Sequence, residues 1–262
     1  MLFPQVLFNL PALALAIWIG SFPFLATAGD ATLPAAPLQY SLKSFEGGAF
    51  HVVRVDLQRA SVSSVWKDGP GQPLLTFQNA LKHLRESKTE PLFMTNAGIF
   101  TPNVAPGGLY VEAGEIKVSI NRNNGEGNFH LKPNGVFFID GEGAHVEDTD
   151  RVTEEMTKTM QIATQSGPLL VRDGELHPKF QVDSENKKIR SGVGVVTPND
   201  VYFVLSKGEV NFHHFARFFR DELKCSNALY LDGVISRFYL PNEPAFQPGI
   251  EQFAAMLVVT AK

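Results

Sequence analysis

Apolar and polar residues alternate along much of the chain with the period of two that is typical of β-strands. In residues 50–57, Val53 and Val55 alternate with Arg54 and Asp56, so one face of this strand is expected to be buried. Turns containing Gly, Pro, Asn or Asp separate many such segments and favour hairpins over long crossovers. The same reasoning predicts strands at residues 92–95, 109–112, 115–119, 135–140, 144–147, 169–171, 175–176, 193–197, 201–205 and 228–231.

Two stretches carry apolar residues at helical spacing. Residues 74–86, which include a start near Pro73, and residues 212–223, which follow a capping Asn211, each predict an amphipathic helix. Strands outnumber helices, with roughly nine or ten strands expected against two or three helices. The predicted fold class is α+β, a single domain around a mixed or largely antiparallel β-sheet with hairpins.

The N-terminal residues 1–28 contain no charged side chain and include an apolar stretch at residues 10–19. They end in the sequence ATA at residues 26–28, the small-x-small pattern of a cleavage site. We therefore predict a signal peptide. An uncleaved membrane anchor stays open as an alternative, although Pro11 and Pro23 interrupt the apolar run that a membrane span requires.

Cleavage after Ala28 would leave a spacer at residues 29–40 and a domain at residues 41–262, with no integral membrane span after processing. The expected location is periplasmic or secreted. Cys225 is the only cysteine, so internal disulfides cannot hold the fold together. The absence of any Asn-x-Ser/Thr acceptor favours a bacterial envelope.

The charge of the chain narrows the class of partner. A formal net charge of -4 and a pI near 6.0, without a stripe of Lys and Arg, argue against a nucleic-acid partner. No zinc or iron spacing and no phosphate-binding loop of the GxxxxGK type is present. We therefore predict no cofactor and no metal site, with a divalent cation left open because carboxylates and amides bind one without a recognisable spacing.

Four short motifs join a polar side chain to glycine where a hydrophobic run ends. Turns that deliver an amide, a guanidinium and a carboxylate from strand ends predict one shared polar pocket, as in an enzyme. The motifs are NAGIF at residues 96–100, QSGP at 165–168, RSGVG at 190–194 and DGVIS at 232–236.

A carboxylate and a guanidinium carry the predicted chemistry. Asp232 leaves a buried strand directly before Gly233, and a carboxylate there suits the role of acid, base or ligand. Arg190 can bind phosphate or carboxylate through two parallel hydrogen bonds. Each has a plain structural alternative: an Asp that caps its own turn, and an Arg that faces solvent after Lys187 and Lys188.

Taken together and in this order, the motifs resemble those of the phosphodiester glycosidase family, which includes the lysosomal uncovering enzyme. The resemblance spans about residues 50–260 and adds PGGL at residues 106–109 to the four motifs. It implies hydrolysis of the glycosidic bond in a sugar-1-phosphodiester, of which N-acetylglucosamine-1-phosphate diesters are the best-known kind. Val234 and Ile235 stand where the family often has glycine or another small residue, so their bulk is expected to narrow or reshape the pocket.

The resemblance also implies roles for particular residues. Asp232 would act as acid, base or nucleophile toward an oxocarbenium-like transition state, and Arg190 would pair with the phosphate. A second carboxylate is optional, because a phosphate leaving group is already stable as an anion. The predicted catalytic residues are Asp232, Arg190 and Asn96; the predicted substrate-binding residues are Gln165, Gly167, Ser236, Gly233 and Phe100; and the candidates for a second carboxylate are Glu112, Glu126 and Asp183.

Two competing functions stay open. One is a glycoside hydrolase that acts on envelope polysaccharide through Asp232 and another carboxylate, without a need for Arg190. The other is a non-catalytic periplasmic protein that binds sugar or phosphate, or assists envelope assembly. The second would bind a ligand without turning it over.

Overall fold

Strand-forming segments build three sheets, and every strand pairing within the described part of the chain is antiparallel. The computed structural model describes residues 1–2, 36–233 and 235–262. The predicted signal peptide and most of the predicted spacer therefore lie outside the described residues, as does Val234. Residues 36–262 form one compact unit of the α+β class.

The largest sheet has seven strands and contains residues 50–56, where apolar and polar residues alternate. Val53 and Val55 are fully buried, whereas Arg54 on the opposite face forms an ion pair with Asp200 of the neighbouring strand. In spatial order the strands are β1 (Leu38–Phe45), β2 (Gly48–Asp56), β13 (Asp200–Ser206), β12 (Ser191–Thr197), β14 (Asn227–Asp232), β10 (Leu169–Arg172) and β11 (Glu175–Leu176).

The second sheet places the last strand of the chain in its interior. The order is β15 (Phe238–Tyr239), β4 (Phe93–Asn96), β16 (Met256–Ala261) and β3 (Ala60–Val65). The last strand, β16, pairs antiparallel with β3 on one side and with β4 on the other.

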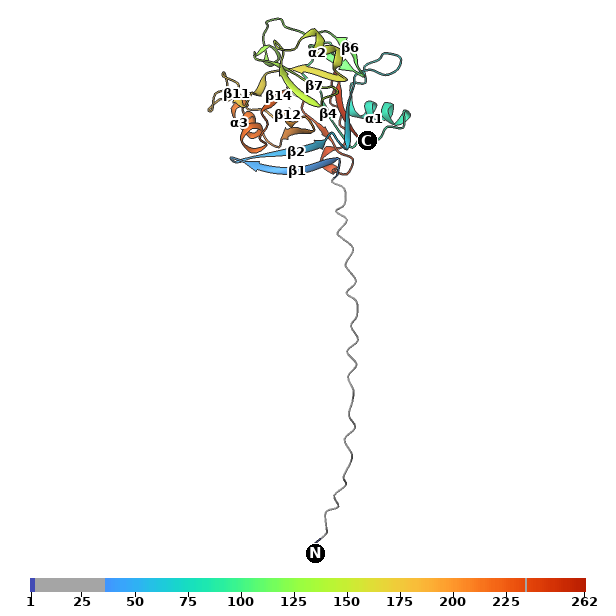
Figure 1. The fold of residues 1–262 in the computed structure, drawn as a ribbon, viewed down its shortest axis with the longest axis vertical. Coiled ribbons are helices and arrows are strands. Elements are labelled where there is room, and N and C mark those ends of the chain that lie inside the picture. Colours follow the sequence, from blue (N-terminus) through green and yellow to red (C-terminus); the bar gives the residue numbers. More distant parts are fainter. Residues whose placement is uncertain (3–35, 234) are drawn as a thin grey trace. The chain divides into compact units, whose positions relative to one another are not determined.

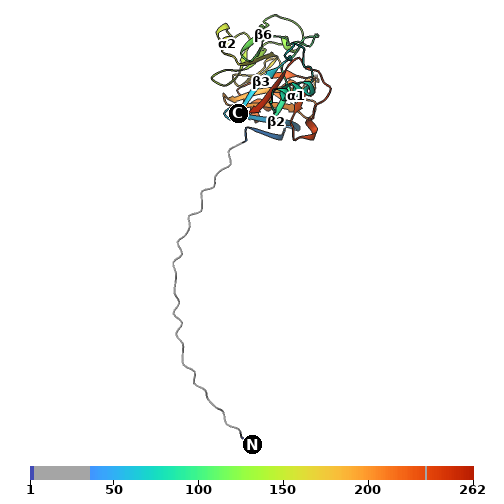
Figure 2. The same cartoon turned by 90° about the vertical axis from the view of Figure 1, so that its right-hand side faces the viewer.

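The third sheet has five strands and contains the most apolar of the predicted hairpins. Its order is β6 (Glu115–Val118), β5 (Tyr110–Glu112), β9 (Ile162–Ser166), β7 (Gly135–Ile139) and β8 (Ala144–Asp148). Figures 1 and 2 show β1 and β2 at one end of the folded unit and β6 at the other.

Three α-helices and three short helical turns complete the described elements. Thr76 caps the first helix, which therefore begins after the predicted start at residue 74. Asn211 caps the third helix as predicted, because its Oδ1 accepts from the His214 backbone N–H at 2.8 Å. The elements are α1 (Phe77–Glu86), α2 (Glu154–Thr159), α3 (Phe212–Arg217), η1 (Asn128–His130), η2 (Phe218–Glu222, a π-helical turn) and η3 (Pro244–Phe246).

One phenylalanine from each sheet meets in the centre of the core. Phe203 of β13 lies 5.4 Å from Phe93 of β4 and 6.0 Å from Phe137 of β7, measured between ring centroids. All three rings are fully buried. The helices α1 and α3 lie on opposite sides of this core in Figure 1. The three sheets are thus packed around one apolar centre, and their strand ends are held in fixed relation.

The observed strands outnumber the nine or ten that were expected. β1 begins at Leu38, inside the predicted spacer, because its residues pair along the whole of β2, with Leu38 opposite Val55. β3, β9, β15 and β16 were not predicted. β3 has a run of Ser and Val without a clear alternation of exposure, and β15 has only two residues.

Candidate active site

Strands from all three sheets end at one place. Ser191 at the start of β12 lies opposite Asp232 at the end of β14. The Asn96 side chain at the end of β4 reaches Ser191, with Nδ2 donating to Oγ at 3.1 Å. Ser166 at the end of β9 donates its hydroxyl to the carbonyl of Leu231 at 3.2 Å. The structure therefore brings the four glycine-bearing motifs of the sequence analysis to a single junction.

Four residues form what we call the site network: Asn96, Ser191 and Ser236 through their side chains, and Asp232 through its backbone carbonyl. Ser236 Oγ donates to the Asp232 carbonyl at 2.8 Å and lies 3.1 Å from Ser191 Oγ. Asn96 Oδ1 accepts the backbone N–H of Arg237 at 3.2 Å. Asn96 and Ser191 are buried. These contacts tie both ends of the turn after β14 to the ends of β4 and β12.

The Asp232 carboxylate is held by the backbone of the turn that follows it. Its Oδ1 accepts the N–H of Gly233 at 2.5 Å and that of Ile235 at 3.4 Å. The residue is 9% exposed, so the carboxylate sits at the edge of the buried network. Asp232 thus caps its own turn, and the capping also fixes the carboxylate in one orientation.

Arg190 precedes Ser191 and is 1% exposed. Its guanidinium lies against the ring of Phe212, with 3.7 Å between Cζ and the ring centroid. Nε donates to the Val210 carbonyl at 2.8 Å, Nη2 to the Asn186 carbonyl at 2.8 Å, and Nη1 to Tyr230 Oη at 3.3 Å. All of these acceptors are neutral, and no carboxylate of the described residues forms an ion pair with Arg190.

The guanidinium therefore carries a buried charge that the protein does not neutralise. Burial lowers the pKa of Arg190, while the neighbouring Tyr230 acts in the opposite direction. An arginine nevertheless stays protonated in a folded protein. The sequence analysis expected two parallel hydrogen bonds from this side chain to an anion. The structure instead turns all three nitrogens toward protein acceptors, with Nη1 donating one of its two N–H groups to Tyr230.

Gly233 allows the turn that carries Asp232 to pack directly over this cation. A Cβ on Gly233 would lie 1.9 Å from Tyr230 Oη and 3.4 Å from Arg190 Nη1. Only a residue without a side chain fits there. The Gly233 turn that follows Asp232 therefore lies directly beside the Arg190 guanidinium. The sequence analysis placed these three residues in one predicted pocket.

The structure places Gln165 outside this group. Its Oε1 accepts the backbone N–H groups of Leu109 and Asn121, each at 2.9 Å. Its Nε2 donates to the Asn121 carbonyl at 2.6 Å and lies 3.3 Å from Thr149 Oγ1. The Gln165 amide thus holds the loop around Asn121 in place, which is a structural role.

Gly167 and Phe100 also stand apart from the site network. A Cβ on Gly167 would lie 2.7 Å from Asn134 Cβ and 2.8 Å from the Phe129 carbonyl, so this glycine lets η1 pack closely against β9. Phe100 is half-buried in the loop after β4, where its backbone bridges to Pro106. Both belong to the motifs but are not part of the site network.

The structure does not join any of the three candidates for a second carboxylate to the site network. Glu112 accepts the Tyr110 hydroxyl at 2.8 Å, and burial raises the pKa of this carboxyl group. Glu126 and Asp183 are exposed on loops. Among the residues that the structure describes, no second carboxylate joins the site network.

Sequence reasoning missed Tyr230 and Asn186, and it did not assign a role to Ser191 or Phe212. The signal for Tyr230 was available, because residues two apart in a strand share a face, and Asp232 follows it at that spacing. No local signal marks Asn186, which lies four residues before Arg190 and contacts it through a loop.

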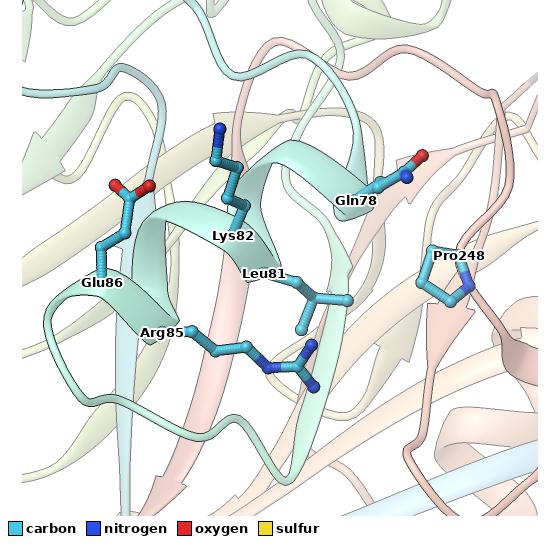
Figure 3. Close-up of a pocket in the computed structure, with 6 residues that line it drawn as sticks. All are labelled: Gln78, Leu81, Lys82, Arg85, Glu86 and Pro248. Carbon is cyan, nitrogen blue, oxygen red and sulfur yellow. The ribbon is translucent and has the colours of Figure 1, made fainter.

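Other features of the described residues do not compete with this site. A shallow hollow of 730 Å³ lies along α1 (Figure 3), but its lining comes from five residues of that helix and Pro248, and none of the motifs contributes to it. The described residues hold no group of three or more His, Cys, Asp or Glu placed to bind a metal ion. In the part of the chain described here, no helix is both long and apolar enough to cross a membrane.

Comparison with known proteins places the chain in a family. A model of the phosphodiester glycosidase family matches residues 90–259, which include the whole site network and Arg190. The uncharacterized protein YigE of Escherichia coli is 34% identical over 186 residues, which cover 71% of this chain and 72% of YigE. The chain belongs to the phosphodiester glycosidase family, as its motifs indicated.

Solved structures share the fold. The catalytic domain of zebrafish N-acetylglucosamine-1-phosphodiester alpha-N-acetylglucosaminidase superimposes with a TM-score of 0.56 at 17% identity, covering 87% of this chain and 85% of that one. A hypothetical protein from Synechocystis gives a TM-score of 0.51 at 13% identity, covering 86% and 62%. At these identities the comparison shows the fold alone, which is a phosphodiester glycosidase fold.

Proposed function

We propose that this protein is an exported hydrolase that cleaves the glycosidic bond of a sugar-1-phosphodiester, of the N-acetylglucosamine-1-phosphate-diester type. The observation that carries the proposal is the buried Arg190 guanidinium, which has only neutral partners and lies under the turn of Asp232. A buried charge is costly unless it is compensated, and a phosphodiester anion supplies the missing charge. Family membership supports the same class of substrate.

The Arg190 cation would accelerate the reaction mainly by stabilising its transition state. Hydrolysis by water breaks the bond between the anomeric carbon and the phosphate oxygen, and yields the free sugar and a phosphomonoester. Negative charge grows on the departing phosphate, so a fixed positive charge stabilises the transition state more than the bound substrate. Asp232 would stabilise or attack the anomeric carbon, or accept a proton from water.

The remaining expectations are parts of this proposal. A periplasmic or secreted location rests on the sequence pattern of residues 1–28. The partner is a small-molecule or glycan substrate, and neither a cofactor nor a metal ion is required. EDTA should therefore leave turnover unchanged.

One observation favours a second candidate, a non-catalytic protein that binds sugar or phosphate. Asp232 caps its own turn through two backbone N–H groups, which is a structural role that needs no chemistry. A polysaccharide hydrolase is less well supported, because it has no use for the uncompensated charge of Arg190.

The deciding experiment offers the chain from Gly29 a panel of sugar-1-phosphodiesters and measures release of free sugar and phosphomonoester. Asp232→Asn is compared with Asp140→Asn, since Asp140 also follows a strand and accepts the N–H of a turn, from Glu142 at 2.9 Å. We expect loss of turnover only in Asp232→Asn, with both variants folded by circular dichroism. Binding of a diester without turnover in the wild type would favour the binding protein.

A further inference from the structure

Tyr230 is the acceptor for the end of Arg190 that faces the Asp232 turn. It lies in β14, is 1% exposed, and its Oη accepts from Arg190 Nη1 at 3.3 Å. The edge of its ring packs against Phe212, with 4.8 Å between centroids and 78° between planes. Tyr230 therefore touches both the guanidinium and the ring on which the guanidinium stacks.

Protein acceptors occupy most of the N–H groups of Arg190. Arginine has five N–H groups. Nε–H goes to Val210 O, and Nη2 points at the carbonyl and the side-chain oxygen of Asn186, at 2.8 and 3.4 Å. Among described residues, Tyr230 is the acceptor recorded for Nη1, so one N–H on this nitrogen remains for a ligand. Tyr230 holds the nitrogen that carries this N–H, while Val210 and Asn186 hold the other two.

Tyr230 accepts this hydrogen bond without neutralising the charge of Arg190. Burial raises the pKa of the Tyr230 phenol well above its usual value of 10.0, and the charge of Asp232 raises it further, against the opposite effect of Arg190. The phenol is therefore a neutral hydroxyl at physiological pH. A carboxylate in the same place would also hold Nη1, but it would compensate the charge that an anionic substrate needs.

From these contacts we propose that Tyr230 is a positioning residue for anion binding: its hydroxyl holds Arg190 Nη1 beneath Gly233, so that the guanidinium presents one N–H and an uncompensated charge to the phosphodiester group. The proposal rests on the proposed function for its substrate class. It assigns Tyr230 no contact with the reacting atoms. Phe212 sets the plane of the guanidinium, and Tyr230 joins the carbonyls of Val210 and Asn186 in fixing its rotation within that plane.

The test is Tyr230→Phe, which keeps the ring and its contact with Phe212 and removes only Oη. Steady-state kinetics with methyl N-acetylglucosamine-1-phosphate are expected to show kcat/KM lowered about tenfold, with kcat lowered as well as KM raised, because the oriented cation acts more strongly on the transition state than on the bound substrate. The matched control is Tyr40→Phe in β1, which loses a hydroxyl contact of 3.0 Å to Nδ1 of His51 in β2. Its kinetics should equal those of the wild type.

A second measurement separates this inference from the proposed function. Calorimetry with dimethyl phosphate reports anion binding without turnover, and Tyr230→Phe should weaken it about tenfold. If the wild type binds dimethyl phosphate and the variant does not, Tyr230 positions the anion site even where no diester is hydrolysed. Unchanged kcat/KM together with unchanged anion affinity would overturn the inference. A fall in kcat/KM that is accompanied by a large loss of thermal stability would also overturn it, because it indicates a structural role alone. Failure of the wild type to bind dimethyl phosphate would overturn it as well.

Discussion

Asn186→Asp places a negative charge beside the buried guanidinium without changing the size of the side chain. Asn186 Oδ1 lies 3.4 Å from Arg190 Nη2, and the backbone carbonyl of the same residue already accepts from that nitrogen at 2.8 Å. A carboxylate oxygen at this position would compensate the charge that the native protein leaves open. The variant should therefore be more stable and bind an anionic substrate less well.

The magnitude follows from the distance and the exposure. Two unit charges 3.4 Å apart attract by about 5 kcal/mol at an effective dielectric constant of about 20. The Asn186 side chain is exposed, so solvent screening reduces the gain to about 1 kcal/mol, as in other partly exposed pairs. We expect the free energy of unfolding to rise by about 1 kcal/mol and KM for a phosphodiester to rise by about fivefold, since about 1.4 kcal/mol corresponds to a factor of ten.

The assay measures urea unfolding and steady-state kinetics on the same preparations. Asn199→Asp is the matched control, because Asn199 is exposed in the turn that follows β12, whereas Arg190 precedes that strand. The control should change neither quantity beyond about 0.5 kcal/mol. If Asn186→Asp lowered KM, or left both stability and KM unchanged, the account of Arg190 as an uncompensated cation would be refuted.

Three further changes test the surroundings of the site. Gly233→Ala should abolish turnover and cost about 2 kcal/mol or more in urea unfolding, because its Cβ would lie 1.9 Å from Tyr230 Oη; an active and stable variant would contradict this packing. Asn211→Ala should lower the free energy of unfolding by about 1–2 kcal/mol, since it removes the cap of α3 and a 2.9 Å donor to Val182 O, and an unchanged unfolding curve would show that neither bond matters. Burial raises the pKa of the Cys225 thiol to about 12, so the unfolded chain loses this proton first as pH rises. Relative to Cys225→Ala, the free energy of unfolding of the wild type should therefore fall by about 1.4 kcal/mol per pH unit above about pH 9, and parallel pH curves would exclude this thiol as the cause.

The sequence was sufficient to predict the fold class and the position of several motifs at strand ends, because both depend on local patterns. Alternation at Val53 and Val55 marks a half-buried strand, and the placement of Asp232 directly after an apolar run marks a strand end. The order of the motifs indicated the family to which the chain belongs.

The roles of single polar side chains could not be predicted in the same way. Gln165 and Asn96 both end apolar strands, yet one fastens a loop and the other joins β4 to β12, and the difference is set by which backbone groups lie opposite each amide. Likewise, the surroundings of Arg190 come from Asn186, Val210 and Tyr230. No periodicity connects these positions, because their proximity arises from the packing of sheets and loops.

The interior position of β16 has a consequence for how the protein acquires its site. Met256 lies opposite Asn96, so the strand that carries Asn96 gains one of its two neighbours only when the final strand of the chain has been made. Pairings between segments so distant in sequence form slowly, since a long loop must close first. A nascent chain that lacks residues 256–261 would contain every residue of the site network and still lack the strand that pairs with β4 beside Asn96. The site would therefore take its final arrangement in one step, when residues 256–261 join β4, rather than growing with the length of the chain.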